Sequence, residues 1–152
     1  MTTRPARSDD IPRIGTIAGA AGLFPPEMVA DMIAPGLAGE GDLWSVIEAQ
    51  GTTAGFTFSR PEEITDRTWN ILALGLDPAF QGQGLGTALL RGTEAALPDA
   101  RMIIIETTQL PEQDAARALY AAAGYEQQAH IPDFYGDGED KVVFVKRVGD
   151  AA

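Results

Sequence analysis

The sequence predicts an α/β protein, in the broad α+β sense, in which helices pack on a mixed β-sheet. The predicted elements run in the order strand, two helices, three strands, helix, strand, helix and two strands. The segment 68–76 is almost wholly apolar, which is typical of a central strand covered on both faces. The length of 152 residues suits one domain with its own core, which we expect over residues 1–148, followed by a short tail at 149–152.

The elements before the central strand follow from turn and helix signals. Ser8, Asp9 and Asp10 are residues that start helices, and isoleucines follow them at helical spacing. Pro35 and Gly36 are expected to stop a second helix. We therefore expect a strand at 2–5, a helix beginning at 8–10, a loop at 22–26, a helix at 27–33, a hairpin with arms 43–49 and 53–59 around a turn at 50–51, and a polar loop at 60–67.

The elements after the central strand are set by the same kinds of residue. Pro98 closes one predicted helix, and Gly124 ends an alanine-rich one. We expect a helix at 84–97, a buried strand at 102–106, a helix at 113–123, and strands at 125–128 and 142–147 joined by a loop rich in Gly and Asp.

Composition excludes several classes of protein. The chain has no cysteine and one histidine, His130, so we expect no disulfide, no metal site and no cysteine nucleophile. A net charge of −11 argues against nucleic acid and favours a cationic amine or peptide. No apolar run reaches the ~20 residues of a membrane span, and the N-terminus lacks a signal peptide's apolar core. We expect a soluble cytoplasmic protein without a membrane partner.

The segment Gln81-Gly82-Gln83-Gly84-Leu85-Gly86 lies between the central strand and a predicted helix. Glycines let the backbone approach a ligand, and the first N–H groups of a helix are unpaired and carry partial positive charge. A pyrophosphate group is the natural occupant of such a turn.

Two other interpretations of this segment stay open. One is a glycine-rich turn without a ligand. The other is a dinucleotide-binding fold, because Gly82 and Gly84 precede a helix and Glu106 ends the next strand 20 residues after Gly86. The third glycine of that fingerprint would fall at Thr87, which argues against it.

Two motifs resemble those of the GCN5-related N-acetyltransferase (GNAT) family. Gln81-x-x-Gly84-x-Gly86 is similar to its pyrophosphate signature, and the segment 114–125, with Tyr120 and Gly124-Tyr125, is similar to its second motif. The ending at 131–144 resembles a subgroup described only in general terms as acetyltransferases. The resemblance implies a mostly antiparallel sheet with a central parallel pair and flanking helices. It also implies direct transfer of an acetyl group from acetyl-CoA to a primary amine, of a small molecule or a peptide N-terminus, in a ternary complex.

The resemblance implies a role for each matching residue. Tyr120 would act as the general acid on the coenzyme A sulfur, and backbone N–H groups near Leu74 and Leu76 would polarise the thioester carbonyl. Gln113 stands where the family has an asparagine. The implied cofactor-binding residues are Leu74, Leu76, Gln81, Gly82, Gln83, Gly84, Leu85, Gly86, Thr87, Gln113 and Tyr120.

The general base is the weakest part of the match. Many relatives use a carboxylate on the central strand, but the matching residue is Asn70, which cannot take a proton and would instead hold a water. Glu106 is a carboxylate in an apolar strand. It is either the base, directly or through a water, or a structural residue that pairs with an arginine or caps a neighbouring helix. Without a strong base an α-amine is the easier substrate. Deprotonation at pH 7 costs about 1.4 kcal/mol for an α-amine of pKa ~8, against about 4.6 kcal/mol for a lysine-type amine.

We expect the substrate pocket between the loop after the first helix and the last hairpin. Its candidate walls are Phe24, Trp44, Trp69, Phe134 and Tyr135, each of which ordinary core or edge packing explains as well. A homodimer is a further expectation from the family. The alternative function is a non-catalytic acyl-CoA-binding regulatory module. The sequence specifies neither the acceptor amine nor the acyl-chain length.

Overall fold

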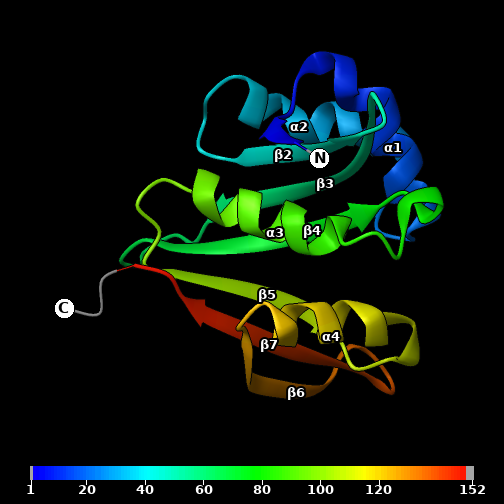
Figure 1. Cartoon of the computed structure of the whole chain (residues 1–152). Coiled ribbons are helices and arrows are strands. Elements are labelled where there is room, and N and C mark those ends of the chain that lie inside the picture. Colours follow the sequence, from blue (N-terminus) through cyan, green and yellow to red (C-terminus); the bar gives the residue numbers. More distant parts are fainter. Residues whose placement is uncertain (1, 150–152) are drawn as a thin grey trace. The chain divides into compact units, whose positions relative to one another are not determined.

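The computed structural model describes residues 2–149, in which seven strands form one sheet of order β1-β2-β3-β4-β5-β7-β6 (Figure 1). The β4–β5 pair is parallel, whereas β1–β2, β2–β3, β5–β7 and β6–β7 are antiparallel. The strands are β1 (Thr2–Pro5), β2 (Leu43–Ala49), β3 (Thr52–Pro61), β4 (Thr68–Leu76), β5 (Met102–Thr108), β6 (Glu126–Gly136) and β7 (Glu139–Arg147). The helices are α1 (Ile11–Ala20), α2 (Val29–Leu37), α3 (Leu85–Ala96) and α4 (Asp114–Ala122). The predicted fold class, a mostly antiparallel sheet with a central parallel pair, is confirmed.

The described chain divides into two compact units, and the division falls within β4. The first unit contains residues 2–61 and 72–98, and the second contains residues 62–71 and 99–149. The expectation of a single domain over 1–148 stays a prediction. The predicted tail at 149–152 lies, except for residue 149, outside the described residues.

The first unit has apolar side chains on both faces of its strands. On one face Phe56 and Ala73 pack with Ile14 and Ile17 of α1, in a cluster that also includes residues of α2. The opposite face packs against α3 through the cluster Ile47, Ala54, Leu85 and Leu89. This alternation follows from the period of two along a strand. It fixes the position of α3, and therefore of the loop that begins it, relative to β4.

Two ion pairs join α1 and its entrance to the strands of the first unit. Asp10 is buried and accepts hydrogen bonds from both terminal nitrogens of Arg4, at 2.8 and 2.9 Å, and from the Thr53 hydroxyl at 3.0 Å. Arg13 of α1 contacts the Asp77 carboxylate at 2.5 Å and donates to the Thr53 carbonyl at 2.8 Å. The second pair ties α1 to the residue that follows β4, where the glycine-rich loop begins.

The second unit is built on the β5–β7–β6 strands. The first four residues of β4 pair with β5 in parallel, from Thr68 with Met102 to Ile71 with Ile105. Helix α4 packs on one face of these strands through Tyr120, whose ring lies 5.8 Å from that of Phe144.

Three local expectations were wrong. Helix α2 continues through Pro35 to Leu37, because a proline near the end of a helix removes only one hydrogen bond. The predicted loop between the last two strands is instead strand almost throughout, and β6 and β7 meet at a turn over 137–138. Backbone pairing does not need apolar side chains, so the exposed polar residues of β6 gave no strand signal. In β4, Leu72 is 41% exposed, so this strand is not covered on both faces along its whole length.

Candidate active site

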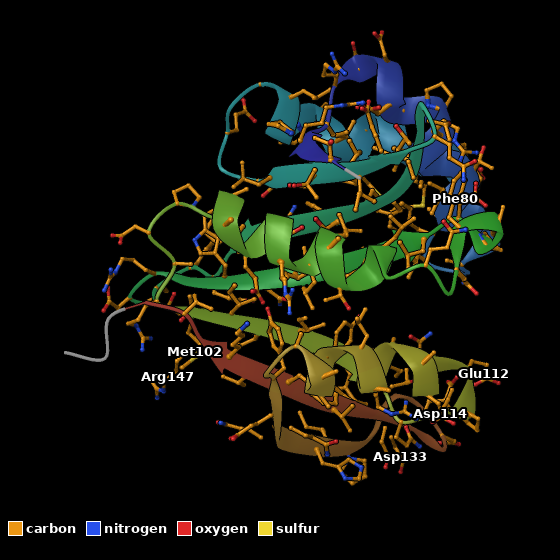
Figure 2. The ribbon with its side chains drawn as sticks, viewed as in Figure 1. Phe80, Met102, Glu112, Asp114, Asp133 and Arg147 are labelled. Atoms are coloured by element: carbon orange, nitrogen blue, oxygen red, sulfur yellow. The ribbon has the colours of Figure 1, made fainter. Side chains whose placement is uncertain are left out.

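The glycine-rich loop begins directly after β4 and ends at the first turn of α3. The Asp77 carboxylate accepts a hydrogen bond from the Ala79 backbone at 2.9 Å, which starts a short 3-10 turn, Pro78–Phe80. Phe80, labelled in Figure 2, packs partly buried against the cluster under α3. Gly82 and Gly84 then adopt φ values of +78°, a conformation that residues with a Cβ rarely adopt.

This loop fits a pyrophosphate group. Gly84 is the N-cap of α3 and has no side chain that could accept hydrogen bonds from the N–H groups of the first turn. These N–H groups precede that of Ala88, which donates to the Gly84 carbonyl. A Cβ built on Gly82 or Gly84 would meet no atom within 4 Å, so the backbone is open to a ligand on that side. Unpaired N–H groups at a helix start are the usual partners of an anion.

The remaining residues of the predicted loop divide into anchors and exposed positions. Leu85 and Gly86 are buried, and Leu85 packs in the core under α3. Gln81 and Gln83 are exposed, and Thr87 is half-buried. The buried anchors therefore hold the start of α3 in place while the loop backbone stays accessible.

Leu74 and Leu76 lie in β4 beyond the last residue that pairs with β5. The parallel register ends at Ile71 and Ile105, so Leu72 to Leu76 continue past it. The side chains of Leu74 and Leu76 pack against the cluster under α3. Their backbone groups are thus held firmly while lying outside the β4–β5 ladder.

Tyr120 is the most buried titratable candidate. Its side chain is 5% exposed and packs between the rings of Tyr125, at 6.4 Å, and Phe144. Burial raises the pKa of Tyr120 to about 12, so its phenol stays protonated at any ordinary pH. A buried phenol that keeps its proton can act as a donor and not as a base.

Gln113 is the residue before α4. Its side-chain oxygen accepts a long hydrogen bond, 3.5 Å, from the Thr107 hydroxyl of β5. Arg117 also joins α4 to the end of β5, because it donates hydrogen bonds to the carbonyls of Thr108 and Leu110. These bonds fix where α4 starts relative to β5.

Glu106 lies on the opposite face of β5 from the α4 contact. It pairs in register with Val143, whereas Phe144, which contacts Tyr120, has its side chain on the other face of β7. The carboxylate of Glu106 forms a 3.0 Å ion pair with Lys141. Sequence reasoning left open a base, the partner of an arginine or a helix cap for Glu106, and the partner found is a lysine. The role of Glu106 as base stays a prediction.

Asn70 is buried in β4 and bonded to a carboxylate that the sequence did not single out. Its Nδ2 donates to Glu62 Oε1 at 2.8 Å, and its own Oδ1 is buried without a hydrogen-bond partner among the described residues. Because a carboxylate only accepts, Glu62 fixes which way the amide is turned. The free oxygen is an acceptor ready for a water or an N–H group.

The five aromatic candidates for the substrate pocket have different environments. Trp44 is buried and stacks on Phe58 at 4.2 Å, and Trp69 is buried in β4. Phe24 is half-buried. Residues 19, 22, 23, 24, 25 and 26 line an open hollow of about 410 Å³. The substrate role of Trp44, Trp69 and Phe24 stays a prediction.

Phe134 and Tyr135 lie in β6, next to Asp133, which Figure 2 labels. Both rings are about half exposed and meet edge to face at 5.0 Å. The ammonium group of Lys141 lies 4.1 Å from the centroid of Phe134. Partial burial, together with the negative charge of Glu106, raises the pKa of Tyr135.

Sequence reasoning missed Glu62 and Lys141. Glu62 was assigned to a polar loop, and nothing local distinguishes it from the adjacent Glu63. Lys141 lies diagonally across from Glu106 in the β5–β7 register, a relationship that exists only once the strands are paired.

Over residues 2–149, no helix is both long and apolar enough to cross a membrane. In the same part of the chain, no group of three or more His, Cys, Asp or Glu side chains is placed to hold a metal ion.

Comparison with known sequences identifies relatives over part of the chain. The sequence pattern of the acetyltransferase (GNAT) family matches residues 21–125. The N-alpha-acetyltransferase RimI of Mycobacterium tuberculosis is 33% identical over 78 residues, which cover 51% of this chain and 48% of that protein. The match thus spans about half the length of the curated relatives found.

Comparison with solved structures extends over nearly the whole chain. The ribosomal-protein-S18-alanine N-acetyltransferase of Escherichia coli has a TM-score of 0.80 at 23% identity, and the match covers 99% of this chain and 96% of that one. A phosphinothricin acetyltransferase of Sinorhizobium meliloti, solved in complex with acetyl-CoA, has a TM-score of 0.78 at 21% identity. The match covers 97% of this chain and 88% of that one. At these identities the similarity establishes the fold.

Proposed function

Because this chain belongs to the acetyltransferase (GNAT) family, we propose that it is an N-acetyltransferase that moves an acetyl group from acetyl-CoA to a primary amine. The observation that carries the proposal is the loop before α3. Gly82 and Gly84 both have φ of +78°, and a Cβ on either would meet no atom within 4 Å. The helix start beyond them accepts the pyrophosphate of coenzyme A.

The residues of the loop and of β4 bind and orient the donor. Gln81 to Thr87 surround the pyrophosphate, and the backbone of Leu74 and Leu76 binds the pantetheine arm and polarises the thioester carbonyl. Gln113 adds a side-chain contact. Bound acetyl-CoA supplies the acetyl group as an activated thioester.

Two side chains move the protons of the reaction. Glu106 takes a proton from the acceptor as the amine nitrogen attacks the carbonyl carbon and the new C–N bond forms. Tyr120 gives a proton to the sulfur as the C–S bond breaks. Its raised pKa keeps the phenol protonated before the reaction, and transfer to a thiolate of lower pKa depends on the alignment of the phenol with the sulfur. Asn70 holds a water or an N–H group with its free oxygen.

A peptide N-terminus or a small amine is the proposed acceptor. One relative is named an N-alpha-acetyltransferase, and one protein of similar fold is named for N-acetylation of an alanine of ribosomal protein S18. An α-amine also suits this site on energetic grounds, because deprotonation costs about 1.4 kcal/mol at pH 7 against about 4.6 kcal/mol for a lysine-type amine. The net charge of −11 favours a cationic acceptor. A homodimer and a cytoplasmic location remain predictions from the sequence.

A second candidate is a non-catalytic acyl-CoA-binding module that regulates another process. Two observations favour it. The central-strand position of the usual base is the amide of Asn70, and Glu106 is already paired with Lys141. The two candidates differ in whether any amine is acetylated, not in whether coenzyme A binds.

The first experiment is calorimetric titration of the purified protein with acetyl-CoA, with NADH as the control ligand. We expect saturable binding of acetyl-CoA and none of NADH. A screen of peptide N-termini and small amines for thiol release then follows. Binding without turnover of any amine would favour the regulatory module, and binding of NADH alone would overturn both candidates.

A further inference from the structure

An amine of the chain itself lies against the candidate base. The Nζ atom of Lys141 is 3.0 Å from Glu106 Oε2 and 4.1 Å above the ring of Phe134. A carboxylate and an aromatic face together make a strong site for an alkylammonium group. The Lys141 side chain is 13% exposed, so the amine is confined to these surroundings.

The contact has a consequence for the reaction. A general base must lie within hydrogen-bond reach of the amine that it deprotonates. If Glu106 is the base, the reacting amine lies where the Lys141 ammonium group now lies. We therefore propose that Lys141 is an intramolecular acceptor, and that the protein acetylates itself at this residue. The inference rests on the proposed acetyl transfer and on Glu106 as its base.

The step balances without any further reactant. Glu106 takes one proton from the Lys141 ammonium group, and the neutral nitrogen attacks the thioester carbonyl carbon of acetyl-CoA. A C–N bond forms and the C–S bond breaks, so that the electron pair leaves with the sulfur. The thiolate takes a proton from Tyr120, the nitrogen releases its second proton as the amide forms, which restores the phenol, and the proton on Glu106 passes to solvent. The products are acetyl-lysine, free coenzyme A and one proton.

The modification would change the site in which it occurs. An acetylated lysine carries no charge, so it forms neither the ion pair with Glu106 nor the cation–π contact with Phe134. The carboxylate of Glu106 is then available to an external amine.

The chain provides an internal control for this reaction. Its only other lysine is Lys146, on the same strand β7, whose Nζ lies 5.5 Å from the ring centroid of Tyr125. Chemical acetylation by acetyl-CoA in solution does not depend on Glu106 and would modify both lysines. Enzymatic self-acetylation would modify Lys141 alone.

The test is incubation of the whole chain with acetyl-CoA, followed by peptide mapping in a mass spectrometer. We expect up to one acetyl group per chain, on Lys141, with a first-order rate constant that does not change on dilution of the protein. Glu106→Gln should slow the reaction roughly 100-fold or more. Glu126→Gln, which changes an exposed carboxylate of β6, should not alter it.

The outcomes separate this inference from the proposed function. Acetylation of an added peptide amine while Lys141 stays unmodified would overturn the inference and leave the function standing. Equal labelling of Lys141 and Lys146, or a first-order rate constant that rises in proportion to protein concentration, would also overturn it. Failure to acetylate any amine in spite of acetyl-CoA binding would remove the proposed function, and the inference with it.

Discussion

Buried Asn70 and half-buried Glu62 form a pair in which the amide donates to the carboxylate at 2.8 Å, and the amide oxygen is left as a free acceptor within residues 2–149. Asn70 is 3% exposed, so its amide cannot turn to bulk solvent. The pair explains how an asparagine is tolerated inside β4. It also places the Glu62 carboxylate within one hydrogen bond of this buried position on β4.

Replacing Glu62 should destabilise the protein through Asn70. Glu62→Ala leaves the buried Nδ2 group without this acceptor, and we expect a loss of about 1–3 kcal/mol in the free energy of unfolding, measured by urea denaturation. Glu63→Ala, at the exposed neighbouring position, should change it by less than about 0.5 kcal/mol. Equal losses in the two variants would contradict the structural role of the pair.

The glycine at the start of α3 should affect binding beyond its effect on stability. Gly84→Ala and Gly39→Ala force an alanine into the same left-handed conformation, with φ of +78° and +76°, and neither Cβ meets an atom within 4 Å. Each should cost about 1–2 kcal/mol of stability. Only Gly84→Ala should weaken acetyl-CoA binding, by at least ~10-fold, about 1.4 kcal/mol. Calorimetric titration of both variants with acetyl-CoA measures this difference. An equal loss of acetyl-CoA affinity in the two variants would refute the assignment of the loop.

Removing the phenol of Tyr120 should slow the reaction without weakening donor binding. Tyr120→Phe keeps the ring that packs on Phe144 and removes the acid, so kcat should fall roughly 100-fold or more while the acetyl-CoA affinity stays the same. Tyr125→Phe is the matched control on the neighbouring buried ring. A kcat for Tyr120→Phe close to that of the native protein would assign Tyr120 to packing alone.

The same phenol predicts how stability changes at high pH. The folded pKa of Tyr120, about 12, lies above the value near 10 of an unfolded tyrosine, because burial disfavours the phenolate. The contribution of the buried, neutral Tyr120 phenol to the free energy of unfolding is complete below pH 10 and is lost as the pH rises from 10 to 12. Absorbance titration should show a tyrosine that ionises late, and this step should disappear in Tyr120→Phe. Titration of every tyrosine near pH 10 in the folded protein would contradict the burial.

Asp10 predicts a loss of stability at low pH. Burial alone would raise its pKa, but hydrogen bonds from Arg4, the Arg7 backbone and Thr53 outweigh burial and hold the pKa below its usual value. The contribution of the ionised Asp10 carboxylate to the free energy of unfolding is therefore complete above the unfolded pKa of about 3.9. It is lost as the pH falls through the lower pKa of the folded protein. Asp10→Asn should destabilise the protein at neutral pH and flatten the acid limb of the stability curve. The same acid limb in both proteins would show that other carboxylates cause it.

The sequence by itself determined the order of the elements, the bounds of β4 and the start of α3, because these depend on local signals. Apolar runs indicate strands, and turns or helix ends are indicated by Pro78, Gly84 and Gly124, without reference to distant residues. The glycine-rich segment was identified for the same reason. Helix α2 beyond Pro35 and the long β6 strand were missed, because they depend on hydrogen bonds that local composition does not reveal.

Only the tertiary structure decided which side chains act together. Asn70 bonds to Glu62, which is eight positions away in the sequence, and Glu106 pairs with Lys141, which is thirty-five positions away. Both contacts depend on how the strands pair, which no local pattern encodes. The structure also placed Tyr120 and Glu106 on opposite faces of the β5–β7 strands, because successive side chains of a strand alternate between its faces. Local sequence thus specifies elements, whereas the partners of a buried or charged group follow from the register in which distant strands pair.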